Sequence, residues 1–253
     1  MKYAVVTGAS SGIGKEFARE LDLKGYSVIL VARRKEKLEE LAKTLHHDSV
    51  IVIADLSKEE ECFQLFDQIK DYPIEVVINN AGFGDYGYFL ETDLNKEMTM
   101  IDVNIKALHI LTKLFLSKMK LNDTGYILNV ASSAGLMPAG PYMSTYYATK
   151  AYVTSLTRGI ARELKENGSH IYVGCLCPGP VKTEFNDIAN VQFALKGIDA
   201  SYCAKYAITQ MFARKVTIIP TFILKLGMTL GRFLPVHLYI RISSHQQRKK
   251  SQS

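Results

Sequence analysis

The stretch KYAVVTGASSGIG, residues 2–14, joins a short apolar run to a glycine-rich turn. The apolar run is typical of a buried strand, and a helical pattern follows the last glycines. Gly8 permits a tight turn, Gly12 lets backbone approach a pyrophosphate, and Gly14 allows close packing of helix on strand. We therefore expect a strand, a ligand-holding turn and a helix in this order.

The same alternation continues along the chain. Further apolar runs of strand length are SVILVA (27–32), VIVIA (50–54), EVVINN (75–80), YILNVA (126–131), IYVGCLC (171–177) and KVTIIP (215–220). Helical patterns follow Gly12, Lys35, Lys58, Asn95, Ser144 and Asp199. Strands that alternate with helices indicate right-handed βαβ units, and strands apolar along their whole length indicate burial on two sides. The sequence predicts a single-domain α/β fold, a Rossmann-like doubly wound parallel sheet with helices on both faces.

Length, composition and cysteine spacing limit the kind of protein that this chain can be. The 253 residues can bury one large core, and the composition is ordinary for a globular protein. The four cysteines have no paired metal-ligand spacing, so we expect reduced core thiols and no metal site. No cleavable signal precedes the strand that begins after Lys2, and we expect a cytoplasmic protein.

Six motifs in one order identify a resemblance. They are TGxxxGxG (7–14), ADL (54–56), NNAG (79–82), DVNIKA (102–107), YYATK (146–150) and PGPVKT (178–183). With these motifs the chain resembles the short-chain dehydrogenase/reductase family from Lys2 to about Phe185. Its ending resembles a branch of bacterial members known only as oxidoreductases.

The resemblance implies a nicotinamide coenzyme and names the residues that would hold it. These are Gly8, Ser10, Ser11, Gly12, Ile13 and Gly14 in the turn; Asp55 and Leu56; Asn80, Ala81 and Gly82; Tyr146 and Lys150; and Pro178, Gly179, Val181 and Thr183. The two serines of the turn also add hydroxyl donors beside the positive end of a helix, which suits an anion.

The end of the second strand distinguishes the two coenzymes. A carboxylate there would bind a ribose 2′-hydroxyl, whereas arginine accommodates a 2′-phosphate. The sequence VARRKEKL places Arg33 and Arg34 at this point, and no acid follows until Glu36. Because a guanidinium fork suits phosphate, we expect NADP(H) to be preferred over NAD(H).

The helical spacing of YYATK selects the acid–base tyrosine. Residues four apart share one helix face, so Tyr146 lies over Lys150 and Tyr147 points away. A nearby ammonium is expected to lower the pKa of the phenol from about 10 toward working pH. The resemblance gives Lys150 the ribose hydroxyls as well, and gives Asn104 a water-linked proton relay.

Two serines compete for the hydroxyl that holds the substrate oxygen. Counting back from Tyr146, Ser133 has the family's usual gap of thirteen residues, whereas counting forward from the strand selects Ser132. Burial fixes strand register, and loops absorb insertions, so we favour Ser132 and keep Ser133 as the alternative.

Aromatic residues and methionine gather around the expected substrate mouth: Phe83, Tyr86, Met137, Tyr142 and Phe185. Such clefts suit bulky apolar ligands. We expect an NADP(H)-dependent carbonyl reductase or alcohol dehydrogenase acting on an acyl, steroid or aryl ketone or secondary alcohol. The alternatives are a non-catalytic NADP sensor or scaffold, and a lipid reductase recruited to membranes by its tail.

The last part of the chain departs from the family. We divide the sequence into a catalytic domain, 1–219, with a substrate loop at about 180–200, and a basic amphipathic extension, 220–253. From Ala200 onward there are nine Lys and Arg and no Asp or Glu, within a net charge of +6. Pro235 separates two short helices with wide apolar faces.

Something must cover these apolar faces. We rank the protein's own body first, a second subunit next, and an anionic membrane surface as possible but not favoured. Nucleic acid is not expected, because the basic residues form no reading motif. The resemblance implies a homodimer or homotetramer.

Overall fold

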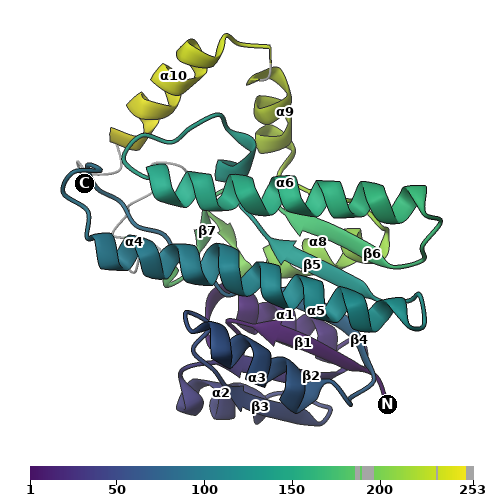
Figure 1. The fold of residues 1–253 in the computed structure, drawn as a ribbon. Coiled ribbons are helices and arrows are strands. Elements are labelled where there is room, and N and C mark those ends of the chain that lie inside the picture. The colour runs from purple at the N-terminus through teal and green to yellow at the C-terminus, as the bar shows by residue number, and fades with distance from the viewer. Residues whose placement is uncertain (186–188, 190–196, 232, 249–253) are drawn as a thin grey trace.

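A parallel seven-stranded sheet forms the centre of the molecule (Figure 1). The computed structural model describes residues 1–185, 189, 197–231 and 233–248. The strands are β1 (Tyr3–Thr7), β2 (Ser27–Ala32), β3 (Ser49–Ile53), β4 (Ile74–Asn79), β5 (Tyr126–Val130), β6 (Tyr172–Leu176) and β9 (Thr217–Ile218). Their order is β3-β2-β1-β4-β5-β6-β9, and every neighbouring pair is parallel. A separate small pair joins β7 (Val181–Lys182) to β8 (Ile198–Asp199).

Helices cover both faces of the sheet. One face packs against α1 (Gly12–Asp22), α2 (Lys35–Ala42) and α8 (Ala200–Phe212). The other face packs against α3 (Glu59–Ile69), α5 (Leu108–Lys120) and α6 (Ser144–Glu166). The alternation of buried strands and one-sided helices is the reason for this layering, and the predicted α/β doubly wound fold is confirmed.

Shorter elements lie around the end of the sheet where the strands finish. The helix α4 (Leu94–Ile101) continues through a π-helical turn, η1 (Asp102–Ala107), directly into α5. A 3₁₀ turn, η2 (Ser133–Leu136), follows β5. Strand order reverses between β1 and β4, and in open α/β sheets ligands bind beyond the strand ends at this point. The topology therefore places the candidate site at the carboxyl ends of β1, β4 and β5.

The extension forms two helices, α9 (Phe222–Gly231) and α10 (Val236–Arg248), which lie at one edge of the molecule, beyond α6 (Figure 1). Among the residues that the structure describes, no helix has both the length and the apolar character to cross a membrane.

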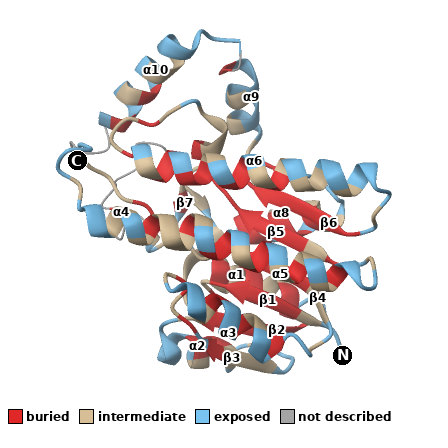
Figure 2. Ribbon diagram, viewed as in Figure 1, coloured by how far each residue is buried: buried red, intermediate tan, exposed pale blue. Residues whose placement is uncertain are grey.

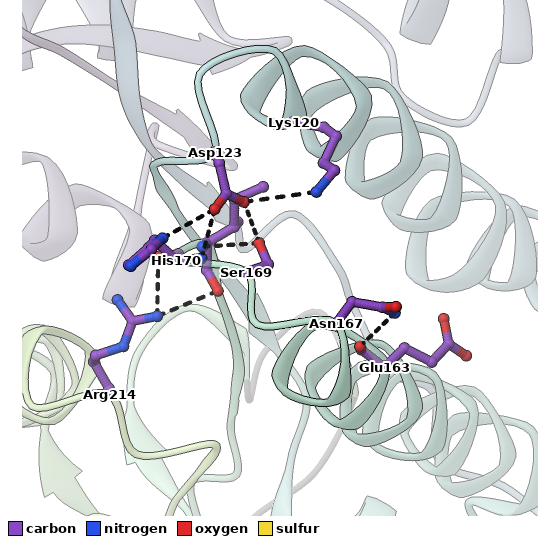
Figure 3. A network of polar contacts seen from close by, with 8 residues as sticks. Lys120, Asp123, Glu163, Asn167, Ser169, His170 and Arg214 are labelled. Carbon is purple, nitrogen blue, oxygen red and sulfur yellow. Dashed lines mark hydrogen bonds and ion pairs between the residues drawn. The ribbon is translucent and has the colours of Figure 1, made fainter.

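A polar network ties two loops together at the opposite end of the sheet (Figure 3). Asp123, in the loop before β5, accepts hydrogen bonds from the Ser169 hydroxyl and from the backbone amide of His170 at 3.0 Å. Lys120 lies 3.8 Å from the same carboxylate. Arg214 donates to the carbonyl of His170 at 3.0 Å. The network fixes the entry of the chain into β5 and β6.

This network predicts an acid-sensitive contribution to stability. The hydrogen bond from Ser169 and those from His170 hold the pKa of Asp123 well below its usual range. A carboxylate with a depressed folded-state pKa stabilises the fold above its unfolded pKa, near 4, and loses that contribution as pH falls. We expect Asp123→Ala to lower Tm by a few degrees at pH 7, and the difference from wild type to shrink below about pH 4. Thermal denaturation across this pH range is the test, and a difference independent of pH would contradict the account.

Candidate active site

The glycine-rich turn lies between β1 and α1 and leaves no room for a side chain at Gly8 or Gly14. Gly8 and Gly12 have φ of +66° and +55°, where glycine is favoured. A Cβ atom on Gly14 would lie 2.2 Å from the Gly8 carbonyl oxygen. Ile13 packs against the core from the same turn. The turn thus leaves backbone amides and the serines Ser10 and Ser11 at the N-terminus of α1, where an anion is stabilised.

The NNAG segment holds this turn in place. The Asn80 side-chain amide donates to the carbonyl oxygens of Thr7 and Gly8 at 2.9 and 3.3 Å. In return the Thr7 hydroxyl accepts from the backbone amides of Asn80 and Ala81 at 2.9 and 3.0 Å. Thr7 is a further site residue, and its position as the last residue of β1, beside the turn, is the sequence signal for it. These reciprocal bonds join β1 to β4 at the switch point.

A buried amide network extends from the same segment. Asn79 donates to Asn129 on the neighbouring strand at 2.9 Å, and Asn129 donates to Thr157 of α6 at 3.0 Å. All three side chains are buried. The network links β4, β5 and α6, and therefore fixes the helix that carries the candidate acid–base residues relative to the glycine-rich turn.

The PGPVKT segment approaches the turn from β6. The Thr183 side chain would lie 3.2 Å from a Cβ on Gly12. The Pro178 carbonyl accepts from the Ser133 amide at 2.8 Å, and Val181 is buried in β7. Gly179 faces Leu224 of α9, whose side chain would lie 3.1 Å from an added Cβ. The segment therefore lies between the candidate coenzyme site and the extension.

Arg33 and Arg34 are exposed at the end of β2. Arg34 donates to the Ser10 hydroxyl at 3.1 and 3.2 Å, which places it beside the glycine-rich turn. It also pairs with Glu184 at 2.9 Å. No acid follows these arginines in the sequence until Glu36, but a carboxylate does compete for Arg34, because the fold brings Glu184 to it from a distance of 150 residues.

Asp55 and Leu56 lie at the end of β3. Leu56 is buried under α3, whereas Asp55 accepts from the backbone amide and hydroxyl of Ser57 at 3.2 and 2.8 Å. Burial alone would raise the pKa of Asp55, but the bonds from Ser57 and the charge of Arg33 lower it. Asp55 therefore stays ionised close to Arg33.

Tyr146 and Lys150 lie on one face of α6, as their spacing predicts. The Lys150 ammonium lies 5.9 Å from the centre of the Tyr146 ring and donates to the Val130 carbonyl at 2.9 Å. Burial lowers the pKa of Lys150 to about 8 and raises the pKa of Tyr146 to about 12. The expected lowering of the tyrosine pKa is therefore reversed, because both groups are buried and desolvation disfavours each charged form. Tyr146 carries a neutral phenol at neutral pH.

Ser132, rather than Ser133, interacts with the Tyr146 hydroxyl. The Tyr146 hydroxyl forms a hydrogen bond with Ser132, which partly offsets the effect of burial on its pKa. Ser132 precedes η2, and its hydroxyl accepts from the Ala134 amide at 3.1 Å. Ser133 contributes its backbone amide to the bond with Pro178 described above.

Asn104 lies inside the π-helical turn η1 and is fully buried. Its side-chain amide donates to the Phe83 carbonyl at 2.9 Å and to the Thr149 hydroxyl at 3.1 Å, and its oxygen accepts from the Phe83 amide at 3.1 Å. A Cβ on Gly82 would lie 2.8 Å from the Asn104 oxygen and 3.3 Å from the Lys150 ammonium. The structure thus brings Asn104, Lys150, Gly82, Tyr146 and Ser132 together from four separate segments.

A cluster of apolar and aromatic side chains packs around Tyr146. The Phe185 ring lies 5.6 Å from the Tyr146 ring, and Phe83, Tyr86 and Met137 belong to the same cluster. Tyr142 stacks on Tyr86 with ring centres 6.0 Å apart. Four of the five predicted pocket residues therefore share a cluster with Tyr146, and Tyr142 is joined to that cluster through Tyr86. Part of the predicted substrate loop at about 180–200 lies outside the described residues.

The extension closes over this aromatic cluster. Gln247 of α10 is buried, and its side chain donates to the Tyr147 hydroxyl. The Tyr86 hydroxyl donates to the Gln247 carbonyl at 3.2 Å, and Arg248 donates to the Tyr142 hydroxyl at 2.9 Å. The sequence favours packing of the extension on the protein's own body, but the polar stripe of the second helix does not specify this position.

Comparison with known proteins agrees with this geometry. Residues 2–192 match the model of the short chain dehydrogenase family. The chain is 33% identical over 227 residues to an uncharacterized oxidoreductase of Staphylococcus epidermidis, which covers 87% of this chain and 97% of that protein. It is also 35% identical over 203 residues to a very-long-chain 3-oxoacyl-CoA reductase of Anas platyrhynchos, covering 76% of this chain and 63% of that relative, less than two thirds of its length.

A solved structure shows the same likeness in three dimensions. The short-chain dehydrogenase from Sphingobium yanoikuyae in complex with NADPH superposes with a TM-score of 0.81 at 27% identity, covering 93% of this chain and 97% of that one. Fold, motif order and sequence agree from the first strand to beyond the PGPVKT segment, and the chain belongs to the short-chain dehydrogenase/reductase family.

Proposed function

We propose that the protein is an NADP(H)-dependent carbonyl reductase or alcohol dehydrogenase acting on a bulky apolar ketone or secondary alcohol of acyl, steroid or aryl type. The observation that carries the proposal is the assembly of Tyr146, Ser132, Lys150 and Asn104 at the end of the sheet that holds the glycine-rich turn. A protein that only senses a nucleotide needs no buried acid–base pair. We assign catalysis to residues 1–219 and treat 220–253 as an extension.

The residues present fit a dinucleotide. The turn keeps Gly8 and Gly12 in conformations that favour glycine and exposes helix N-terminal amides, which would hold a pyrophosphate. Beside it, Asp55, Ala81, Gly82 and Thr183 complete the ring of positions assigned to the coenzyme. A bound nicotinamide coenzyme would supply or accept the hydride at its C4 position.

The protein's own side chains would donate the proton to the substrate oxygen and replace it afterwards. With a pKa of about 12, the Tyr146 phenol is protonated at neutral pH and can donate to a carbonyl oxygen as it gains charge. Ser132, bonded to the same phenol, would hold that oxygen in place. Lys150 would return the proton and hold the ribose, and Asn104 fixes the backbone of Phe83 at the mouth of the site.

The cluster over Tyr146 supports the substrate class. Its apolar and aromatic surface favours a large apolar ligand over a charged one. Because Phe185 packs directly on Tyr146, a substrate would have to displace this side chain to reach the hydroxyl. The name of the avian relative, a 3-oxoacyl-CoA reductase, supports an acyl ketone as the first group to try.

The two arginines support the preference for NADP(H), as does the NADPH bound by the Sphingobium relative. We expect Arg33→Ala combined with Arg34→Ala to weaken NADPH binding by about 10- to 100-fold and to change NADH binding little, because the lost contacts are to the 2′-phosphate. Fluorescence titration with both coenzymes measures the effect. Lys43→Ala, at the far end of α2, removes one exposed positive charge away from the glycine-rich turn and serves as the control. Equal losses for both coenzymes would contradict the assignment.

Oxidation of NADPH in the presence of a substrate panel tests the function itself. The panel runs from small ketones through decalones and steroids to 3-oxoacyl thioesters, with NADH in parallel. We expect turnover with NADPH that rises with the apolar size of the ketone. Coenzyme binding without turnover of any member would favour the non-catalytic sensor.

A further inference from the structure

The extension exposes large apolar side chains that the body does not cover. Phe222, Ile223 and Phe233 are 76%, 85% and 84% exposed. Others more than a third exposed on the same two helices and their connection are Leu226, Leu230, Leu234, Val236, Leu238 and Ile242. Figure 2 shows α9 and α10 as mostly exposed ribbons standing away from the buried sheet. So many exposed large apolar side chains on two adjacent helices indicate an interaction site.

This surface is held in a fixed position by the opposite sides of the two helices. Leu224 of α9 lies against Gly179, and Ser243 of α10 donates to the Ala139 carbonyl at 3.2 Å. The Tyr239 ring packs on Gly231, which joins α10 to α9. The protein's own body, ranked first as the cover of the extension, therefore covers only one side of it.

The charged side chains of the two helices are all basic. Lys225 and Arg241 are exposed on α9 and α10, and the sequence places no Asp or Glu anywhere after Asp199. A two-fold contact with a second copy would set this face against itself, with basic side chains and no carboxylate to pair with them. An anionic lipid surface instead offers negative headgroups and an apolar interior together.

We propose that α9 and α10 form a surface that binds reversibly to anionic membranes, with Phe222, Ile223 and Phe233 entering the lipid interface and Lys225 and Arg241 contacting the headgroups. The helices lie on the interface and do not span it, because neither is long enough to cross. The proposal is independent of the catalytic assignment. The exposed apolar side chains and the basic residues beside them both favour a membrane surface over the protein's own body or a second subunit as the partner of these helices.

Vesicle flotation of the full chain tests this surface. The probes are phosphatidylcholine vesicles with and without phosphatidylserine, each at low and high salt. We expect about tenfold more wild-type protein on the anionic vesicles, and a decrease at high salt as the charges are screened. Wild-type protein that stays in solution with both vesicle types would overturn the proposal.

Two pairs of substitutions locate the contact. Phe222→Glu with Ile223→Glu should reduce binding to anionic vesicles by about tenfold or more, because it places charge in the lipid interface. Leu23→Glu with Leu121→Glu adds the same charge at exposed leucines of the body, 67% and 83% exposed, and should bind like wild type. Equal losses from both pairs would overturn the assignment of the surface.

Thermal denaturation shows whether the two glutamate substitutions disturb folding. If they do, a second pair of substitutions that keeps the apolar side chains still tests the proposal. Lys225→Gln with Arg241→Gln keeps every apolar side chain and should reduce the preference for phosphatidylserine and its salt dependence. Size measurements without vesicles complete the test. A wild-type oligomer that dissociates in the Phe222→Glu, Ile223→Glu variant, with no vesicle binding by wild type, would identify a subunit contact and overturn the proposal.

Discussion

Replacing Tyr146 with Phe is expected to lower kcat for ketone reduction by about 10³-fold, the usual contribution of a positioned general acid. The substitution removes the hydroxyl that bonds to Ser132 and leaves the ring packed against Phe185. The glycine-rich turn is untouched, so NADPH should still bind, with an affinity within about tenfold of wild type for the loss of one hydroxyl contact. Steady-state kinetics and a fluorescence titration of the same preparation measure the two quantities separately.

The neighbouring tyrosine is the matched control. Tyr147→Phe removes a hydroxyl that bonds to Gln247 and Ser243, on the side of the cluster that faces α10. We expect at most about a tenfold change in kcat, the size of one lost hydrogen bond. Equal effects at the two positions would show that the tyrosines act through packing, and the assignment of Tyr146 as the acid would be wrong.

Replacing Gly14 with Ala should have the largest effect on the coenzyme site. The new methyl group would lie 2.2 Å from the Gly8 carbonyl oxygen and 2.5 Å from the Asn80 side-chain nitrogen. Either the turn or the Asn80 side chain must therefore move. Overpacking of this kind costs about 1–3 kcal/mol, and a shift of about 1 Å in a positioned group can cost about 100-fold. We expect Tm to fall by roughly 5 °C and NADPH affinity to fall by about 100-fold.

Gly159 provides the control for this substitution. It lies exposed in the middle of α6, and a Cβ there would meet nothing within 4 Å. Gly159→Ala should therefore stabilise the protein by about 0.5–1 kcal/mol through helix propensity and leave coenzyme binding unchanged. Wild-type stability and affinity in Gly14→Ala would contradict the close packing described for the turn.

The sequence predicts much of this architecture because the responsible forces are local. Apolar runs located every long strand to within one or two residues, and the helical pattern that follows Ser144 matches the start of α6. The i, i+4 spacing of Tyr146 and Lys150 correctly indicated a shared helix face. Strand register favours Ser132 as the substrate-binding serine, because it lies two residues after β5, and its hydroxyl lowers the pKa of Tyr146.

Features that depend on distant contacts could not be predicted in this way. Glu184 reaches Arg34 only because the chain returns over the turn after β6. The direction of the Tyr146 pKa depends on total burial, which spacing along a helix does not give. The position of α10 over Tyr86 and Tyr147 depends on contacts between residues 100 or more apart.

Hydride transfer itself is the central claim, and isotope tracing tests it most directly. NADPH deuterated at C4, prepared separately in its two stereochemical forms, is mixed with the protein and the best ketone of the panel, and the alcohol is analysed by mass spectrometry. We predict that deuterium appears at the carbinol carbon from one form only, and that Tyr146→Phe suppresses this product. An alcohol without deuterium from either form, or coenzyme that binds and is never oxidised, would contradict the account.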